Sequence, residues 1–145
     1  MIKLASLIYL DAVYELEKQF GAEAFSKRSL RHFILTSQLY VFVDNDDNVI
    51  GSAIILKRKN SNRCRLYSFI IDDRFRGKGV GKNYLHVLLE QLTYKEITLE
   101  VSENNKPAIG LYTLLGFEVT GTKSEYYKNK DNALVMKKVL DKFQK

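Results

Sequence analysis

Cysteine, proline and histidine are scarce in this sequence, and tryptophan is absent. The one cysteine, Cys64, rules out a disulfide within the chain and a metal site built on several thiolates. The two histidines, His32 and His86, lack the spacing of metal ligands, so no metal is expected. The one proline and the scattered glycines mark no linker. Residues 1–145 are therefore predicted to form a single domain.

Long hydrophobic runs are also missing. No apolar stretch approaches the roughly 20 residues of a membrane-spanning helix, and the N-terminal segment 4–10 does not have the form of a secretory signal. Hydrophobic residues nevertheless make up 46% of the chain, which is enough for a packed core and argues against disorder. We therefore expect a folded cytoplasmic protein that does not contact membranes.

Positive charge is in modest excess. The chain carries 23 lysines and arginines against 17 acidic residues, which gives a formal net charge of +6. Such a surplus favours acidic partners, for example a phosphorylated cofactor, RNA or an acidic protein, although it is equally typical of a solubilising surface. The basic stripe with interleaved aromatic residues that marks nucleic-acid-binding modules is not evident. No direct contact with nucleic acid is therefore expected.

Hydrophobic periodicity predicts an α/β (α+β) fold with a mixed sheet. Alternating or β-branched runs predict strands over residues 2–5, 39–43, 49–56, 63–71, 96–101, 117–120 and 133–139. Helical spacing predicts helices over 7–20, 31–35, 80–92 and 107–115, with Ser26 or Ser29 as the cap of the second. The order β-α-α-β-β-β-α-β-α-β-β places helices on the faces of the sheet.

The segment 74–82 carries the strongest functional signal, because it joins a predicted strand to an amphipathic helix. Its three alternating glycines are Gly77, Gly79 and Gly81. Glycine lets the backbone approach a ligand closely, and the free N–H groups of the following helix attract anions. The basic side chains of the segment are Arg76, Lys78 and Lys82. We predict a pyrophosphate-binding turn, with a flexible turn carrying solvated lysines as the alternative.

Two other phosphate-binding loops can be excluded for this segment. A P-loop ends in Gly-Lys followed by Ser or Thr, whereas Asn83 follows Lys82 here. A dinucleotide fingerprint requires G-x-G-x-x-G, whereas residues 77–81 read G-x-G-x-G. The pattern that remains, from Arg76 to Gly81, is R-x-x-G-x-G.

This pattern resembles the acetyl-CoA pyrophosphate loop of the GNAT superfamily of N-acetyltransferases, whose signature is Q/R-x-x-G-x-G/A. Two downstream segments resemble the same superfamily: Leu99-Glu100-Val101 at the end of a strand, and residues 105–117, which match N-x-x-A-x-x-L-Y-x-x-x-G-F. The resemblance covers about residues 1–140. It implies the GNAT fold, a mostly antiparallel sheet of about seven strands flanked by four helices, and acetyl transfer from acetyl-CoA to a primary amine.

Within the superfamily the sequence is most similar to the RimI-like group, which acetylates the N-terminal alanine of a ribosomal protein. The similar segments are Phe25-Ser26, Glu125-Tyr126-Tyr127 and Asn132-Ala133-Leu134-Val135-Met136. Two departures stand out: Asp72-Asp73 replaces the group's Asp-Pro before the loop, and a tryptophan of the N-terminal region is missing. The resemblance makes a protein N-terminus, such as that of a ribosomal protein, the predicted acceptor.

The resemblance also implies roles for individual residues. Those expected to bind acetyl-CoA are Phe69, Ile70 and Ile71 along the pantetheine arm, Arg76, Gly77, Lys78, Gly79, Val80, Gly81 and Lys82 around the pyrophosphate, and Asn105. Tyr112 matches the general acid, which faces the sulfur of the cofactor, and Glu100 matches the general base. From the residues alone, Tyr112 could equally be a core aromatic and Asn105 a helix cap. Glu100 could be a solvated strand residue, with Glu103 as a rival base.

Amine acetylation needs residues of these types. The amine arrives as an ammonium and must lose a proton, which a carboxylate can accept directly or through water. An α-amine has a pKa of about 7.7–8.0 against about 10.4 for lysine, so a protein N-terminus demands roughly 3.5 kcal/mol less from the base. A phenol can protonate the departing thiolate, and a backbone N–H of Ile70 or Ile71 can stabilise the oxyanion.

Two other functions remain open from the sequence. One is acetylation of another amine, namely a polyamine, an amino sugar, an amino acid or a lysine side chain. The other is a CoA-binding module without catalysis. The oligomeric state, monomer or dimer, is also open.

Overall fold

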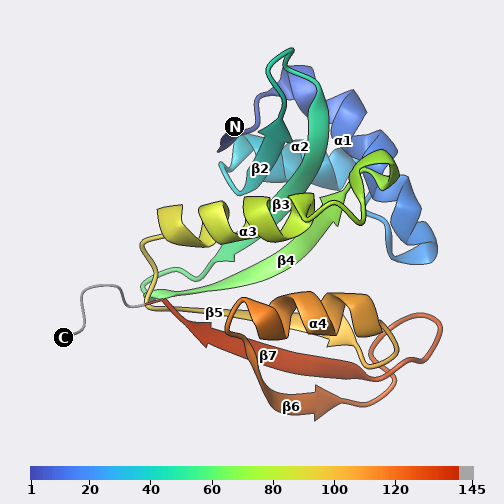
Figure 1. Ribbon diagram of the computed structural model, residues 1–145, viewed down its shortest axis with the longest axis vertical. Coiled ribbons are helices and arrows are strands. Elements are labelled where there is room, and N and C mark those ends of the chain that lie inside the picture. The colour runs from blue at the N-terminus through green and yellow to red at the C-terminus, as the bar shows by residue number, and fades with distance from the viewer. Residues whose placement is uncertain (141–145) are drawn as a thin grey trace.

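Within residues 1–140, seven strands form one sheet in the order β1-β2-β3-β4-β5-β7-β6 (Figure 1). The computed structural model describes residues 1–140, so the end of the predicted 1–145 domain, residues 141–145, lies outside the described residues. The strands are β1 (Ile2–Leu4), β2 (Leu39–Val43), β3 (Val49–Lys57), β4 (Arg63–Ile71), β5 (Glu96–Ser102), β6 (Glu118–Lys123) and β7 (Ala133–Val139). Neighbouring strands are antiparallel except β4 and β5, which are parallel. The mixed, mostly antiparallel sheet is therefore confirmed.

In the described part of the chain, four α-helices cover the two faces of the sheet, as predicted. They are α1 (Leu10–Glu17), α2 (Lys27–Leu35), α3 (Val80–Gln91) and α4 (Lys106–Leu114). In Figure 1, α3 and α4 lie in front of the sheet and α1 and α2 behind it. Each face buries its own apolar cluster: Leu30 and Val41 belong to the cluster of α1 and α2, and Leu85 and Ile97 to that of α3 and α4. Burial on both faces explains why β3 is apolar over most of its length.

The helix predicted over residues 7–20 is divided into three segments. A 3₁₀ helix, η1 (Leu7–Tyr9), precedes α1, and a second one, η2 (Lys18–Glu23), follows it. Gly21 inside η2 adopts a φ of 58°, a left-handed conformation that interrupts the helix. Ser26, one of the two predicted caps, caps α2, because its hydroxyl accepts a hydrogen bond from the Ser29 N–H. The helix therefore begins at Lys27, ahead of the predicted residues 31–35.

The strand predicted over residues 117–120 lies further along the chain, as β6. Phe117 is instead buried in the core, where its ring packs edge-on against that of Tyr112 at 5.7 Å. Pairing with β7 then continues to Lys123 opposite Ala133. The other strands and helices begin and end within one residue of their predicted bounds.

Candidate functional site

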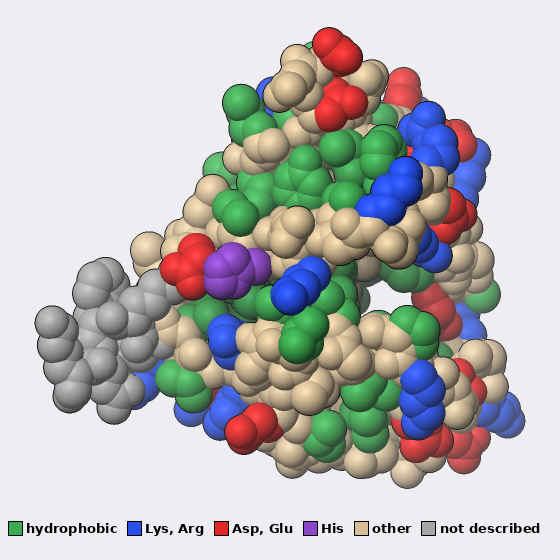
Figure 2. Space-filling model, in the orientation of Figure 1, with side chains coloured by type: hydrophobic (Ala, Val, Ile, Leu, Met, Phe, Trp, Pro, Cys, Tyr) green, Lys and Arg blue, Asp and Glu red, His purple; other side chains and the backbone are tan. Residues whose placement is uncertain are grey.

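The candidate site is a cavity between the two halves of the sheet. β4 and β5 pair over only three residues each, 63–65 with 96–98, and then diverge (Figure 1). A bulge at Tyr67 shifts the register of β4 against β3 where the divergence begins. The opening holds a cavity of about 910 Å³, and Figure 2 shows it as a gap between the α3 half and the α4 half. From residue 66 onward, the β5 side of β4 has no strand partner among residues 1–140.

The cavity brings together most of the residues predicted to bind acetyl-CoA. Those that line it are Phe69, Ile70, Ile71, Arg76, Gly77, Gly79, Val80, Gly81, Lys82, Asn105 and Tyr112. Lys78 is exposed and does not line the cavity. Glu100, the predicted base, lines it from β5, whereas the rival Glu103 lies outside and accepts a hydrogen bond from Asn132 Nδ2 at 3.1 Å.

The turn between β4 and α3 depends on glycine for its shape. Gly77 and Gly79 have φ values of 77° and 75°, in the left-handed region, and no atom lies within 4 Å of where a Cβ would stand on either. A Cβ on Gly81 would lie 3.3 Å from Ile71 Cγ1, so α3 packs closely against β4. Gly79 is the N-cap of α3, and it supplies no side-chain hydrogen bond to the free amides of the first turn. These amides, at the positive end of the helix dipole, have the arrangement that anions bind.

Arg76 holds this turn against its neighbours. Its Nε donates to the Ile71 carbonyl at 3.3 Å, and one Nη donates to Gln19 Oε1 at 2.7 Å. The other Nη forms an ion pair with Asp73 at 2.9 Å. The guanidinium is therefore engaged by the protein itself, and its contribution to an anion site is the positive charge that it brings to the turn.

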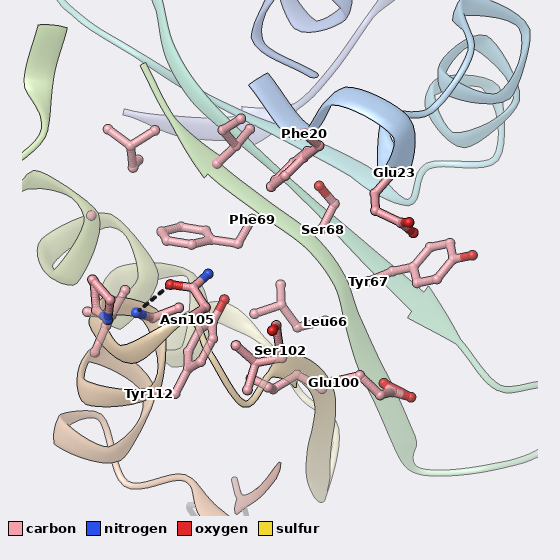
Figure 3. Close-up of a pocket in the computed structure, with 18 of the residues that line it drawn as sticks. Phe20, Glu23, Leu66, Tyr67, Ser68, Phe69, Glu100, Ser102, Asn105 and Tyr112 are labelled. Carbon is pink, nitrogen blue, oxygen red and sulfur yellow. Dashed lines mark hydrogen bonds between the residues drawn. The ribbon is translucent and has the colours of Figure 1, made fainter. Parts of the chain in front are cut away.

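Asn105 and Tyr112 enter the site from α4 (Figure 3). Asn105 caps the helix, because its Oδ1 accepts a hydrogen bond from Ala108 N at 3.2 Å, which leaves its side-chain NH₂ group to donate elsewhere. The Tyr112 ring packs on Phe117, so the tyrosine is a core aromatic and lines the cavity at once. Burial raises the pKa of Tyr112 above the ordinary value of a phenol. At neutral pH its hydroxyl is therefore a proton donor.

Two cations hold the carboxylate of Glu100. Lys123 Nζ lies 3.1 Å from Oε1, and Arg65 Nε lies 3.0 Å from Oε2, as an ion pair without hydrogen-bond geometry. The Glu100 side chain is only 8% exposed. Arg65 is itself fixed, since its guanidinium lies 4.7 Å from the centre of the Tyr67 ring and donates to the Tyr126 hydroxyl at 2.8 Å. Glu100 is thus charge-paired within the protein and is not the solvated strand residue that the sequence left as an alternative.

One end of the cavity is lined by η2 and by the loop between β6 and β7, which are distant in sequence. Lys128, between β6 and β7, donates from its N–H to Glu23 Oε2 at 2.9 Å and from Nζ to the Ala22 carbonyl at 2.7 Å. The rings of Tyr126 and Tyr127 pack edge-on in the same loop, and burial raises the pKa of Tyr127 to about 12. No local sequence signal indicates this bridge, because its partners are 105 residues apart.

Sequence reasoning missed Glu17, the last residue of α1. Its side chain is almost fully buried and lines the cavity. Burial raises its pKa to about 6, and the Phe25 N–H and the neighbouring Ser68 hydroxyl act in the opposite direction. A signal was present, since Glu17 follows Val13 by four residues and so lies on the apolar face of the helix, where a carboxylate is unusual.

Neither a metal cluster nor a membrane helix is found in the described part of the chain. Among residues 1–140, no group of three or more His, Cys, Asp or Glu side chains is placed to hold a metal ion. No helix in the same range is long and apolar enough to cross a membrane. Cys64 is buried, and burial raises its pKa to about 12, which makes it a structural thiol.

Similar proteins share both the sequence pattern and the fold. The profile of the acetyltransferase (GNAT) family matches residues 10–117. A ribosomal protein bS18-alanine N-acetyltransferase of Haemophilus ducreyi is 27% identical over 133 residues, which cover 87% of this chain and 90% of that protein. A spermine/spermidine N(1)-acetyltransferase of Bacillus subtilis is 42% identical over 65 residues, which cover 42% of this chain and 43% of that protein.

Two further comparisons concern length and fold. An uncharacterised protein of Mycobacterium leprae is 30% identical over 127 residues, which cover 81% of this chain but 34% of that protein, so the chain spans about a third of its length. The crystal structure of Ard1 from Thermoplasma volcanium superposes with a TM-score of 0.85 at 24% identity and covers 96% of each chain. This likeness confirms the predicted fold.

Proposed function

The chain belongs to the acetyltransferase (GNAT) family, and from this premise we propose that it moves the acetyl group of acetyl-CoA to the α-amine of a protein N-terminus. Family membership makes the chain an acetyl-transferring enzyme. The observation that carries the proposal is the divergence of β4 and β5, which places a free strand edge, a glycine turn and Tyr112 around one cavity.

Acetyl-CoA fits the residues on the α3 side of the cavity. The free edge of β4 at residues 69–71 offers backbone N–H and C=O groups to the amides of the pantetheine arm, as an added strand would. The amides at the start of α3 suit the pyrophosphate, and the open space over Gly77 and Gly79 is the room that this group needs. Asn105 supplies a side-chain N–H donor. The cofactor brings an activated thioester to this site.

Acetyl transfer to an ammonium removes two protons from the nitrogen, one before the attack and one as the amide forms, and delivers one proton to the sulfur. The second proton of the nitrogen passes to water, so that one proton is released overall. The amine nitrogen attacks the thioester carbonyl carbon, the N–C bond forms, and the C–S bond breaks with its electron pair on sulfur. Tyr112, which burial keeps protonated, donates its proton to that sulfur. Glu100 accepts the proton from the ammonium, directly or through water. A backbone N–H of Ile70 or Ile71 stabilises the charge on the carbonyl oxygen.

A protein N-terminus is the acceptor that this chemistry favours. An α-amine requires roughly 3.5 kcal/mol less for deprotonation than a lysine side chain. The similarity to a ribosomal-protein N-acetyltransferase extends over nearly the whole length of both chains, which supports the same acceptor class.

A polyamine is the second candidate acceptor, and one observation favours it. The similarity to the spermine/spermidine acetyltransferase is higher in identity, at 42%, although it covers under half of each chain. Acidic side chains that could attract a polycation also line the cavity, namely Glu17, Glu23, Glu100 and Asp131.

Separate assays with different acceptors distinguish N-terminal acetylation from polyamine acetylation. The purified chain is incubated with acetyl-CoA and one of three acceptors: a peptide with a free N-terminal alanine, the same peptide blocked at its N-terminus but carrying a lysine, or spermidine. We expect the free peptide to react at least about tenfold faster than the others, as measured by mass of the product. Turnover of spermidine alone would replace the proposal by the polyamine alternative. Preference for the blocked peptide would contradict both.

A further inference from the structure

Two buried polar side chains beside the cavity lack hydrogen-bond partners. Glu17 Oε2 and Ser68 Oγ have none within residues 1–140, although the two residues are only 1% and 9% exposed. Both residues line the cavity, Glu17 from the end of α1 and Ser68 from β4, just past the bulge at Tyr67. Buried polar atoms are nearly always satisfied in folded proteins, so this pair at the cavity wall has hydrogen-bonding capacity left for a polar group inside the cavity.

The buried negative charge of Glu17 is energetically unfavourable in its surroundings. Within residues 1–140 its Oε1 accepts a hydrogen bond from the Phe25 N–H at 3.3 Å, and no lysine, arginine or histidine in that range forms an ion pair with it. It also stands at the C-terminus of α1, the negative end of the helix dipole. A glutamine of the same shape would keep the bond to Phe25 without a buried charge. The packing therefore does not require the negative charge.

Glu17 differs in its lack of an ion pair from Glu100, the proposed base. Both oxygens of Glu100 already lie near cations, one near Lys123 and the other near Arg65. Glu17 has no such partner in the described chain, and it is more deeply buried than Glu23 and Asp131, which also line the cavity. It is therefore the buried carboxylate whose charge a cation from outside would balance. Its position suits the reacting amine, because Ser68 immediately precedes the segment 69–71 that is proposed to hold the pantetheine arm.

We propose that Ser68 and Glu17 together bind the ammonium group of the acceptor. The Ser68 hydroxyl accepts a hydrogen bond from the ammonium and donates a hydrogen bond to the Glu17 carboxylate. The negative charge of Glu17 balances the cation. Glu17 is therefore a positioning residue that acts through Ser68. The pair selects acceptors that arrive as a primary ammonium. This inference rests on the proposed function, because it assigns the side chains that bind the amine to be acetylated.

The test compares three variants of the chain. Glu17→Gln removes the charge and keeps the bond to Phe25, Ser68→Ala removes the contact with the ammonium, and Glu15→Gln is the matched control. Glu15 lies on the exposed side of the same helix and forms an ion pair with Lys18 at 2.9 Å. For each variant we measure KM and kcat for the preferred amine, the dissociation constant of acetyl-CoA, and the melting temperature.

We expect Glu17→Gln and Ser68→Ala to raise the KM for the amine about tenfold, the effect of losing one charge-assisted hydrogen bond. The dissociation constant of acetyl-CoA should stay within about twofold, and the melting temperature of Glu17→Gln should not fall, because a buried unpaired charge is removed. Glu15→Gln should match the wild type in all four measurements.

Three outcomes would overturn the inference. An unchanged KM in Glu17→Gln would show that the carboxylate has no part in binding the acceptor. A fall in melting temperature together with weaker acetyl-CoA binding would show that it only supports the loop around Phe25. A wild-type chain that acetylates no primary amine would instead overturn the proposed function, and the inference with it, before any variant is compared.

Discussion

The two walls of the cavity are built in different ways. The α3 wall consists of a strand edge and a glycine turn, residues 69–71 and 76–82, which follow one another in the sequence. The opposite wall joins η2 to the loop between β6 and β7 through Glu23 and Lys128, which are 105 residues apart. The first wall presents mainly backbone groups, and the second presents carboxylates, tyrosines and an arginine.

From this difference we infer that the α3 wall binds acetyl-CoA and that the opposite wall binds the amine acceptor. Backbone amides and glycine conformations suit a ligand whose diphosphate and amide groups are always the same. Side chains from distant segments suit the amine acceptor, which each enzyme must distinguish from other amines. Changes in the α3 wall are therefore expected to affect reaction with every acceptor alike, and changes in the opposite wall are expected to affect particular acceptors.

The largest effect is expected for Tyr112→Phe, which removes the proposed acid between the two walls. Loss of a general acid typically slows turnover about 100-fold or more, so kcat should fall by that order for every acceptor. The dissociation constant of acetyl-CoA should change little, and the fold should persist, because the phenyl ring can still pack on Phe117. Release of free thiol from acetyl-CoA measures the rate.

Tyr84→Phe is the matched control for this prediction. Tyr84 lies on α3, stacks on Phe42 at 4.9 Å and does not line the cavity. Its variant should retain the wild-type kcat. Undiminished turnover by Tyr112→Phe would show that another group protonates the sulfur.

A smaller effect is expected for Gly79→Ala, which strains the α3 wall. A residue with a Cβ costs roughly 1–2 kcal/mol in the left-handed conformation that Gly79 adopts, although the Cβ itself would meet no neighbour within 4 Å. If binding requires this conformation, the dissociation constant of acetyl-CoA should rise by about tenfold and equally for every acceptor. Isothermal titration calorimetry measures it.

Gly110→Ala is the control for Gly79→Ala. Gly110 lies within α4, has no atom within 4 Å of a Cβ position and is exposed. Alanine there should raise the free energy of unfolding by roughly 0.5–1 kcal/mol and leave acetyl-CoA binding unchanged. Equal binding by Gly79→Ala and Gly110→Ala would contradict a conformational role for Gly79.

The last prediction concerns the free energy of unfolding and its dependence on pH, and it involves Glu17. The pKa of Glu17 is raised from 4.5 to about 6 by burial, so its contribution is fully present below pH 4.5 and is lost as the pH rises through 6. A difference of this size corresponds to about 2 kcal/mol. Asp44, Asp47 and Asp72 have lowered pKa values, so their contributions are lost only as the pH falls below 3.8 and do not overlap this window.

Urea unfolding between pH 4.5 and 7 measures this slope. The wild type should lose stability across the interval, and Glu17→Gln should lose about 2 kcal/mol less. A variant that follows the wild-type curve would show that Glu17 does not titrate in this range.

The same contrast explains what could be predicted from the sequence. The strands and helices follow from local periodicity. The glycine turn and the motif over residues 105–117, which contains Tyr112, are also local patterns. The division of residues 7–23 escaped prediction, because it depends on one left-handed glycine, Gly21. The bridge from Lys128 to Glu23 and the facing of Glu17 toward Ser68 also escaped, since tertiary packing alone brings these residues together.

The most direct test of the account is an amide-resolved NMR titration of the chain with acetyl-CoA. We expect one acetyl-CoA per chain, with the strongest shifts at the amides of residues 69–71 and 77–82 and weak shifts on η2 and the β6–β7 loop. Absence of binding, or shifts confined to residues outside the gap between β4 and β5, would contradict the claim that this gap holds the acetyl donor.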